Sequence, residues 1–193
     1  MASRPETGQL ETGPLETLPL ETGRLRLRAL GPGDAAALYP TMSDAAAMQY
    51  WSRAPFTSIA ELGAHFARNA DSPWHGWAIT RVGDDTAIGF ASAGEKRQGA
   101  VTEIGYLLAR DAWGDGIARE AVGAVIDHLF ARGQRRVCAD TDPDNMASNR
   151  LLERLGFQRE ALLRAEWETH IGVRDSIIWG LLKDEWRGSR VSS

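Results

Sequence analysis

The sequence has little cysteine and no long apolar run, and each shortage excludes a class of protein. Its 193 residues include one cysteine, Cys138, which cannot form a disulfide within the chain or supply a cysteine-rich metal site. No apolar run approaches the roughly 18 residues of a membrane span; Ile177 to Leu182 is among the longest. The first six residues lack the apolar stretch of a secretory signal. We therefore expect a cytoplasmic protein that is not inserted in a membrane.

The sequence also has no excess of basic residues over acidic ones. Lys plus Arg number 22 against 26 for Asp plus Glu, so the formal net charge is −4. This balance gives no general attraction to nucleic acid or to an anionic membrane, and we expect neither as a partner. His65, His128 and His170 do not have the mutual spacing of metal ligands, so no metal site is predicted.

The first part of the chain repeats a unit of five residues, Glu-Thr-x-x-Leu, beginning at Glu6, Glu11, Glu16 and Glu21. A period of five matches neither a helix nor a strand, and glycines and prolines within the repeats interrupt regular hydrogen bonding. We predict an extended or disordered arm at residues 1–20, a single domain at 21–187, and a short tail at 188–193. A domain of that length can bury an adequate core without disulfides.

The periodicity of the remaining residues predicts a mixed α/β fold. Strands are expected at 25–30, 77–82, 86–93, 101–108, 136–141, 157–163 and 174–183. Helices are expected at 34–39, from 43 or 44 towards 51, at 58–69, from 117 until Gly133 ends it, and at 147–155. The first strand is not followed by a glycine-rich turn, which argues against a Rossmann domain.

A glycine-rich turn does follow the strand that ends at Leu108. Its sequence, Trp113-Gly-Asp-Gly116, leads directly into a helix. Small residues let a ligand approach the backbone, and the free N–H groups at a helix start bind phosphate oxygens. The turn has no Gly-Lys-Ser or Gly-Lys-Thr, so it is not a nucleotide-hydrolysing P-loop. On this turn alone, an anion site and a tight β–α turn with purely steric glycines both remain open.

A second stretch, Asp140 to Phe157, contains Asn145-x-x-Ser148 and ends in Gly-Phe. Taken with the glycine turn, it resembles the two coenzyme A motifs of the GCN5-related N-acetyltransferase (GNAT) superfamily, in particular its RimJ/RimL-like branch. The resemblance runs from Glu21 to Trp186. It implies a single-domain α/β fold whose mixed central sheet, flanked by helices, is splayed at an acyl-CoA cleft, with a β-bulge making the opening.

The resemblance also implies acetyl-CoA as the acyl donor, a primary amine as the acceptor, direct transfer without an acyl-enzyme, and no metal. The amine is a protein N-terminus or a small molecule. The residues implied to bind the cofactor are Tyr106, Leu107, Leu108, Arg110, Trp113, Gly114, Asp115, Gly116, Ile117, Ala118, Arg119, Asn145 and Ser148. The carboxylate of Asp115 departs from the family pattern and weakens phosphate binding unless it points outward or Arg110 and Arg119 compensate.

Acetyl transfer needs a base for the amine and a proton for the departing thiolate. We expect Glu103 to be the base and Ser148 to supply the proton. The alternatives are a solvent-facing Glu and a Ser that serves as a helix N-cap or as a polar residue of the first turn. Tyr50, Trp51 and Asp140 are expected to form the acceptor site, with core packing as the alternative for the aromatic rings.

Other functions also remain open at this point. They are transfer of succinyl or another acyl group, an acyl-CoA-binding module without catalysis, and a nucleotide-phosphate-binding protein. The grouping of Trp167, Trp179 and Trp186 predicts a homodimer that pairs through the C-terminal strands, because grouped aromatic residues often mark interface cores.

Overall fold

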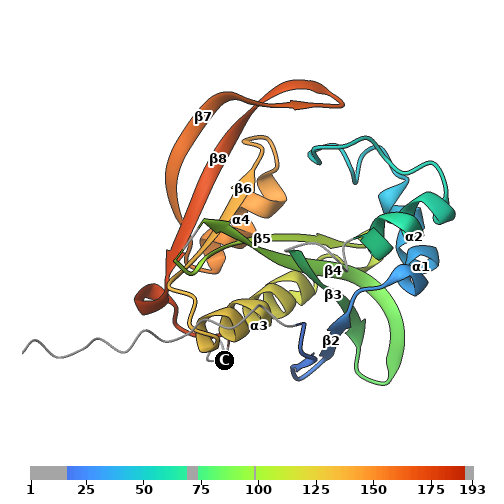
Figure 1. Cartoon of the computed structure of the whole chain (residues 1–193), viewed down its shortest axis with the longest axis horizontal. Coiled ribbons are helices and arrows are strands. Elements are labelled where there is room, and N and C mark those ends of the chain that lie inside the picture. The colour runs from blue at the N-terminus through green and yellow to red at the C-terminus, as the bar shows by residue number, and fades with distance from the viewer. Residues whose placement is uncertain (1–16, 69–73, 98, 190–193) are drawn as a thin grey trace, which may run out of the picture.

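The computed structural model describes residues 17–68, 74–97 and 99–189, and its centre is an eight-stranded sheet in the order β1-β2-β3-β4-β5-β6-β8-β7 (Figure 1). The strands are β1 (Leu20–Glu21), β2 (Leu25–Ala29), β3 (Trp74–Arg81), β4 (Asp84–Arg97), β5 (Val101–Leu108), β6 (Arg136–Thr141), β7 (Gln158–Thr169) and β8 (Gly172–Leu182). Neighbouring strands are antiparallel except β5 and β6, which are parallel. The predicted mixed sheet is therefore confirmed, whereas residues 1–16 of the predicted arm lie outside the described residues.

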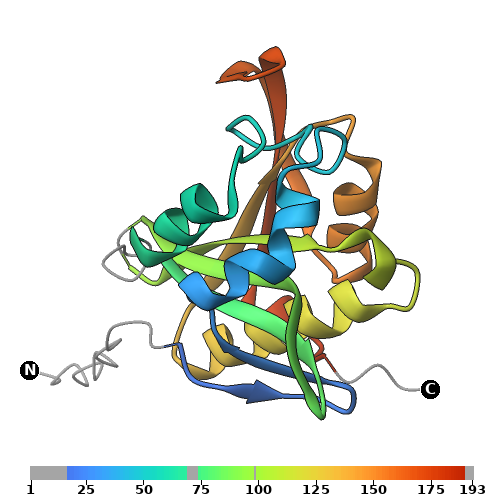
Figure 2. The same cartoon turned by 90° about the vertical axis from the view of Figure 1, so that its right-hand side faces the viewer.

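Helices cover both faces of the sheet (Figures 1 and 2). They are α1 (Ala35–Met42), α2 (Ile59–Arg68), α3 (Ile117–Ala131) and α4 (Met146–Arg154). Alternation along β3 shows how the core divides: Trp77 and Ile79 pack in the cluster with α3 and α4, whereas Ala78 packs in the cluster with α1 and α2. Among the described residues, no helix has both the length and the apolar character needed to cross a membrane.

The sheet opens between β5 and β6. Their pairing extends only from Val101 opposite Arg136 to Glu103 opposite Cys138. Beyond Glu103, β5 continues on β4 to Leu108, and β6 continues on β8 to Thr141, so the two strands diverge while each keeps its other neighbour. The predicted splay is thus present.

The β-bulge expected to make this opening is not on β5. The register of β5 with β4 is continuous from Thr102 to Leu108, and the one irregularity between these strands lies at Lys96 of β4. The expectation was wrong because divergence of the two parallel strands is enough to end their pairing. The irregularity instead places an extra residue, Lys96, at the closed end of the opening.

Two further elements differ from the sequence prediction. Residues 44–53 form a series of turns rather than a helix, and Met48 inserts into the core from them. Strand β7 extends six residues farther than expected, to Thr169, and β8 begins two residues earlier, at Gly172. Together they form a long hairpin that projects beyond the rest of the molecule (Figure 2). The distal half of β7 is exposed on both faces, so its sequence has no apolar alternation that could have predicted a strand.

Candidate active site

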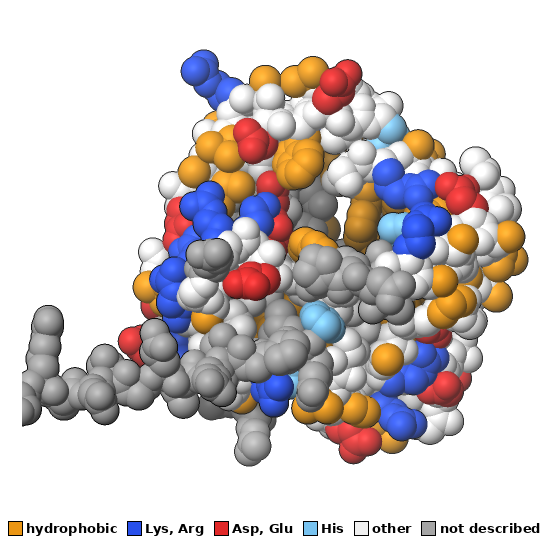
Figure 3. Space-filling model, viewed as in Figure 1, with side chains coloured by type: hydrophobic (Ala, Val, Ile, Leu, Met, Phe, Trp, Pro, Cys, Tyr) orange, Lys and Arg blue, Asp and Glu red, His pale blue; other side chains and the backbone are white. Residues whose placement is uncertain are grey.

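A cleft of about 300 Å³ lies where β5 and β6 diverge. Figure 3 shows this face of the molecule hollowed between the side of the β7–β8 hairpin and the side of α1 and α2. The cleft brings together both predicted catalytic residues and every predicted acceptor residue. The predicted residues that line it are Tyr50, Trp51, Glu103, Tyr106, Asp140, Asn145 and Ser148.

Glu103 lies at the closed end of the cleft, and its side chain is only 13% exposed. The Nζ atom of Lys96 lies 2.9–3.0 Å from its two carboxylate oxygens. Burial opposes the charge of Lys96, but the hydrogen bond and the charge of Glu103 outweigh it and raise the pKa of the ammonium. Glu103 is therefore a paired carboxylate inside the cleft and not the solvent-facing residue of the alternative reading.

Gly94 of β4 pairs with Glu103 and explains how an aromatic ring comes to lie beside it. A Cβ atom on Gly94 would lie 2.6–2.9 Å from the ring of Trp74, too close for any side chain. The glycine thus lets Trp74 pack over the strand and line the cleft next to Glu103. Trp74 and Lys96 are site residues that the sequence analysis did not identify.

Ser148 lies in the first turn of α4, so of its two structural alternatives the N-cap is wrong and the polar first-turn residue fits its position. Asn145 is the N-cap residue, since its Oδ1 atom accepts a hydrogen bond from the Ser148 amide at 3.2 Å. The hydroxyl of Ser148 is therefore not needed for capping. The Tyr106 hydroxyl donates to the Ser148 carbonyl at 3.5 Å, and burial raises the pKa of Tyr106 to about 12. Tyr106 thus places a protonated phenol in the cleft, which was not foreseen.

Asp140 is held from the hairpin side. Its Oδ2 atom accepts a hydrogen bond from the Trp167 indole at 3.0 Å, and its Oδ1 atom accepts one from the Ser176 hydroxyl. Trp51 enters from the opposite wall and packs against Phe90, with 5.7 Å between ring centroids. Aromatic rings and a carboxylate therefore face the cleft from two separate parts of the chain.

The glycine turn adjoins the open end of β5. Gly114 and Gly116 have left-handed backbones with φ of +93° and +75°, and Gly116 is the N-cap of α3. Among the described residues no side chain caps this helix, so its first N–H groups have no side-chain partner there. The indole of Trp113 donates to the Leu108 carbonyl at 2.8 Å and ties the turn to the strand end. The predicted order of strand, glycine turn and helix is therefore present, and binding of an anion by this turn stays a prediction.

Comparisons with known proteins decide the family. A family model described as the acetyltransferase (GNAT) domain matches residues 24–158. The uncharacterized N-acetyltransferase p20 of Bacillus licheniformis is 33% identical over 173 residues, which are 86% of this chain and 96% of the relative. The chain belongs to the GNAT acetyltransferase family. The resemblance seen in the motifs is thereby confirmed, and the protein is an acyltransferase.

Solved structures share the fold. The spermidine N-acetyltransferase of Vibrio cholerae, in complex with CoA and spermine, has a TM-score of 0.75 at 22% identity and covers 85% of this chain and 98% of its own. RimL, a ribosomal L7/L12 alpha-N-protein acetyltransferase in complex with CoA, has a TM-score of 0.75 at 22% identity and covers 86% and 98%. Both confirm the fold class of this GNAT enzyme.

In this GNAT enzyme, the guanidinium of Arg24 lies beside the glycine turn. The sequence analysis did not identify Arg24. Its Nη1 atom donates to the Asp115 carbonyl at 3.1 Å, and its Nε atom donates to Glu120 at 2.8 Å. Arg110, one of the two arginines that could compensate for the carboxylate of Asp115, has its Nη2 atom 3.6 Å from Asp44. Arg24 is paired with Glu120, so it ties the turn to α3 and adds no unpaired positive charge.

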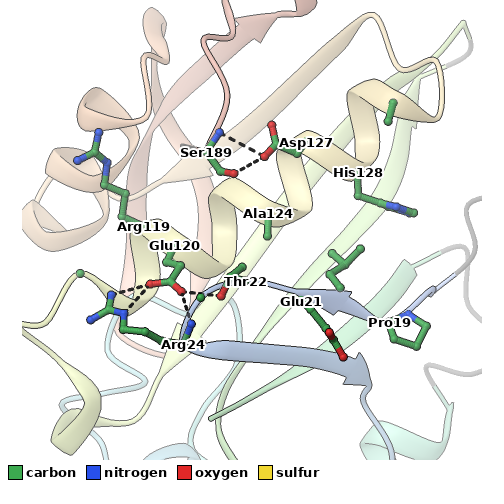
Figure 4. Close-up of a pocket in the computed structure, with 14 residues that line it drawn as sticks. Pro19, Glu21, Thr22, Arg24, Arg119, Glu120, Ala124, Asp127, His128 and Ser189 are labelled. Carbon is green, nitrogen blue, oxygen red and sulfur yellow. Dashed lines mark hydrogen bonds and ion pairs between the residues drawn. The ribbon is translucent and has the colours of Figure 1, made fainter. Parts of the chain in front are cut away.

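A larger hollow of about 1100 Å³ lies between β1 and α3 of the GNAT domain (Figure 4). Polar side chains of α3 in this hollow bind residues from the first and the last described segments of the chain. Glu120 accepts from the Thr22 hydroxyl at 2.5 Å, and Asp127 accepts from the Trp186 indole at 2.6 Å and from the Ser189 amide at 3.2 Å. These carboxylates are engaged in structural contacts, and the groups suited to acyl transfer lie in the smaller cleft.

Cys138 is poorly suited to carry an acyl group in this enzyme. Its side chain is buried, with Sγ 3.5 Å from the Thr102 carbonyl oxygen. Burial raises the pKa of the thiol to about 11, so the nucleophilic thiolate is scarce at neutral pH. The described residues also contain no group of three His, Cys, Asp or Glu side chains placed to hold a metal ion.

The three tryptophans behind the dimer prediction serve different roles within the GNAT domain. Trp179 is buried and donates to the Thr141 hydroxyl at 2.8 Å, Trp186 bonds to Asp127, and Trp167 lines the cleft. They do not form one patch, and the homodimer stays a prediction.

Proposed function

We propose that this GNAT enzyme transfers an acetyl group from acetyl-CoA to a primary amine by direct attack in the cleft between β5 and β6. One observation carries the proposal. The cleft formed where the strands diverge beyond Glu103 is lined by a paired carboxylate and by Ser148 of α4, and the strand β5 that borders it leads through the glycine turn into α3.

Two features of the chain fit coenzyme A. The edge of β5 beyond Glu103 has lost its β6 partner, so its main-chain groups are available to the pantetheine amides. The turn from Trp113 to Ala118 offers N–H groups at the start of α3 to the pyrophosphate, and no atoms lie within 4 Å of a Cβ position at Gly114. Both features belong to the backbone, so the side-chain types in the sequence do not by themselves reveal a coenzyme A site.

The reaction assigned to the cleft forms a C–N bond and breaks the C–S bond of the thioester. Glu103 takes a proton from the acceptor ammonium, directly or through water, and Lys96 orients its carboxylate. The main-chain N–H near Leu107 stabilises the oxyanion, and Ser148 donates the proton that the thiolate needs. The acceptor ammonium loses two protons as it becomes an amide: one leaves through Glu103 to solvent, and the second passes from the nitrogen of the tetrahedral intermediate to Ser148, where it replaces the proton given to the thiolate. The products are the amide, CoA as the free thiol and one proton, so no further reactant is required.

The acceptor and the branch are finer proposals. We place the enzyme in the RimJ/RimL-like branch, with acetyl rather than succinyl as the transferred group. The two neighbours described above act on different amines by their names, a ribosomal protein N-terminus and spermidine. A cleft of about 300 Å³ accommodates a small amine or the first residue of a peptide. A cytoplasmic location also remains a proposal.

The experiment measures thermal shift with acetyl-CoA, CoA and ATP, and then thiol release against a panel of amines. Acetyl-CoA should stabilise the fold and ATP should not. Binding without thiol release for any amine would favour the non-catalytic module, and faster release from succinyl-CoA would favour the other acyl donor. Glu103→Gln should lower kcat by roughly 100-fold or more with acetyl-CoA affinity kept. Glu153→Gln, on the exposed side of α4, is the matched control, and full activity of Glu103→Gln would exclude Glu103 as the base.

A further inference from the structure

We infer that the acceptor carries a second cationic group besides the reacting amine, and that Asp140 binds this second group. The inference rests on the proposed function, because it concerns the acceptor of the same reaction. Its basis is the charge balance inside the cleft and the position of Asp140 relative to Glu103.

Acidic side chains outnumber basic ones in the cleft. The charged residues that line it are Lys96, Glu103, Asp140, Asp142, Arg174 and Asp175, four acids and two bases. Each base is already paired with one of the acids: Lys96 with Glu103, and Arg174 with Asp142 at 2.7 Å. The pairs leave two negative charges, which favour a cationic ligand over a neutral one.

Asp140 is the unbalanced carboxylate nearest the reaction centre. Its hydrogen-bond donors, Trp167 and Ser176, are both neutral, and among the described residues no Lys, Arg or His nitrogen forms an ion pair with it. These bonds fix the orientation of the carboxylate without cancelling its charge. Such a group is prepared to receive a cation.

The spacing along the sheet separates the two amine sites. Glu103 is opposite Cys138, and Asp140 lies two residues farther along β6. At about 3.3 Å per residue, the second site is roughly 7 Å beyond the first in the strand direction. A short alkyl spacer between two amino groups covers this distance.

Lys96 shows that the cleft tolerates an ammonium at this end. Burial alone would lower the pKa of Lys96. The hydrogen bond to Glu103 and the negative charges of Glu103 and Asp140 have the larger effect, so the pKa is raised and both carboxylates act on this one cation. Trp167, whose indole is fixed by Asp140, lines the same space and offers an aromatic surface to a cation. The volume of about 300 Å³ favours a small diamine over a long basic peptide.

The test compares acceptors that differ only at the far end. One is a diamine with a short alkyl spacer, and the other is the amino alcohol of the same length. Wild-type enzyme should show a kcat/KM at least roughly tenfold higher for the diamine, because a carboxylate discriminates an ammonium from a hydroxyl. A peptide acceptor can also carry two positive groups, a free N-terminus and a basic second residue. This acceptor is compared with the same peptide carrying a neutral second residue.

Variants then locate the discrimination. Asp140→Asn should raise the KM for the diamine by about tenfold, remove most of its advantage over the amino alcohol, and keep the KM for acetyl-CoA. Asp184→Asn, an exposed carboxylate in the turn after β8, should change nothing.

Three results separate the inference from the proposed function. Equal kcat/KM for the diamine and the amino alcohol in the wild-type enzyme would overturn the inference and leave the acetyltransferase intact. An Asp140→Asn variant that loses both acceptors equally would assign Asp140 a structural role and would also overturn it. No thiol release with any amine would overturn the proposed function itself.

Discussion

At Gly116, the backbone conformation allows a direct test of the proposed cofactor binding. Its φ of +75° is left-handed, and only the Arg24 guanidinium lies within 4 Å of a Cβ position there, at 3.9 Å. A branched side chain would be strained and would cover the N–H groups that begin α3. Gly116→Val should therefore raise the KM for acetyl-CoA by tenfold or more, as an order-of-magnitude estimate, or abolish binding.

Gly83 provides a matched control for this prediction. It has a similar φ of +85°, it lies in the turn between β3 and β4, and nothing is within 4 Å of its Cβ position. Gly83→Val should lower the thermal midpoint much as Gly116→Val does but leave the KM for acetyl-CoA unchanged. If the two variants bind acetyl-CoA equally well, the glycine turn does not hold the phosphates.

Two hydroxyls compete for the role of proton donor to the thiolate. Ser148 lies in the first turn of α4, and Tyr106 keeps its proton because its pKa is raised to about 12 by burial. With Ser148 as donor, Ser148→Ala should lower kcat by about 100-fold, whereas Tyr106→Phe should cost less than about tenfold. Steady-state kinetics at saturating acetyl-CoA measures both. The reverse order would move the role to Tyr106.

At the scale of elements, the strand β2 region and α3 are joined through Arg24 and Glu120. Arg24 bonds both to Glu120 and to the Asp115 carbonyl, so the last copy of the five-residue repeat restrains the glycine turn. Arg24→Gln should raise the KM for acetyl-CoA about three- to tenfold and leave kcat unchanged. Arg26→Gln, exposed on β2, is the control. A kcat loss with an unchanged KM for acetyl-CoA would contradict this role.

The hairpin of β7 and β8 is anchored by Arg174, which pairs with Asp142 and Asp144. Burial of Asp142 opposes ionisation, but the hydrogen bond from Arg174 outweighs it and lowers the pKa of that carboxyl. A lowered carboxyl pKa gives stability that is present above the ordinary value of about 3.9 and is lost as pH falls through the lowered one.

The pH dependence of this anchor can be measured. Arg174→Gln should lower the thermal midpoint at pH 7, and the difference from wild type should shrink below about pH 4 as Asp142 becomes protonated. Arg159→Gln, on the exposed face of β7, is the comparison. A difference that stays constant from pH 7 to pH 3 would show that the ion pair contributes nothing.

At the scale of the whole molecule, the sequence predicted local elements and motifs better than contacts between residues far apart in the chain. Buried residues at helical spacing predicted α3, and Gly133, with φ of +90°, ends it as expected. Motifs adjacent in sequence, such as the glycine turn, were also found. The partnership of Lys96 with Glu103 depends on a strand irregularity, and the bond from Arg24 to Asp115 spans 91 residues. Neither leaves a periodic pattern in the sequence.

The predicted homodimer concerns the whole molecule, and the β7–β8 hairpin offers a physical reason to expect it. β7 is an edge strand of the sheet, with one side of its backbone open to pairing. Exposed apolar side chains lie on β7, at the hairpin turn and at the start of β8: Leu162, Ile171 and Val173. An exposed edge with apolar side chains favours association with a second copy.

Light scattering at micromolar concentration should give twice the 21.1 kDa mass of the chain. Val173 is 62% exposed, so Val173→Lys adds a charge to the apolar surface with little cost to the fold and should return the mass to that of one chain. Val82→Lys, an equally exposed valine on the β3–β4 turn, should leave the mass doubled because it lies far from the hairpin in the sheet order. A single-chain mass for wild type at every concentration would contradict the dimer and leave the acetyltransferase unaffected.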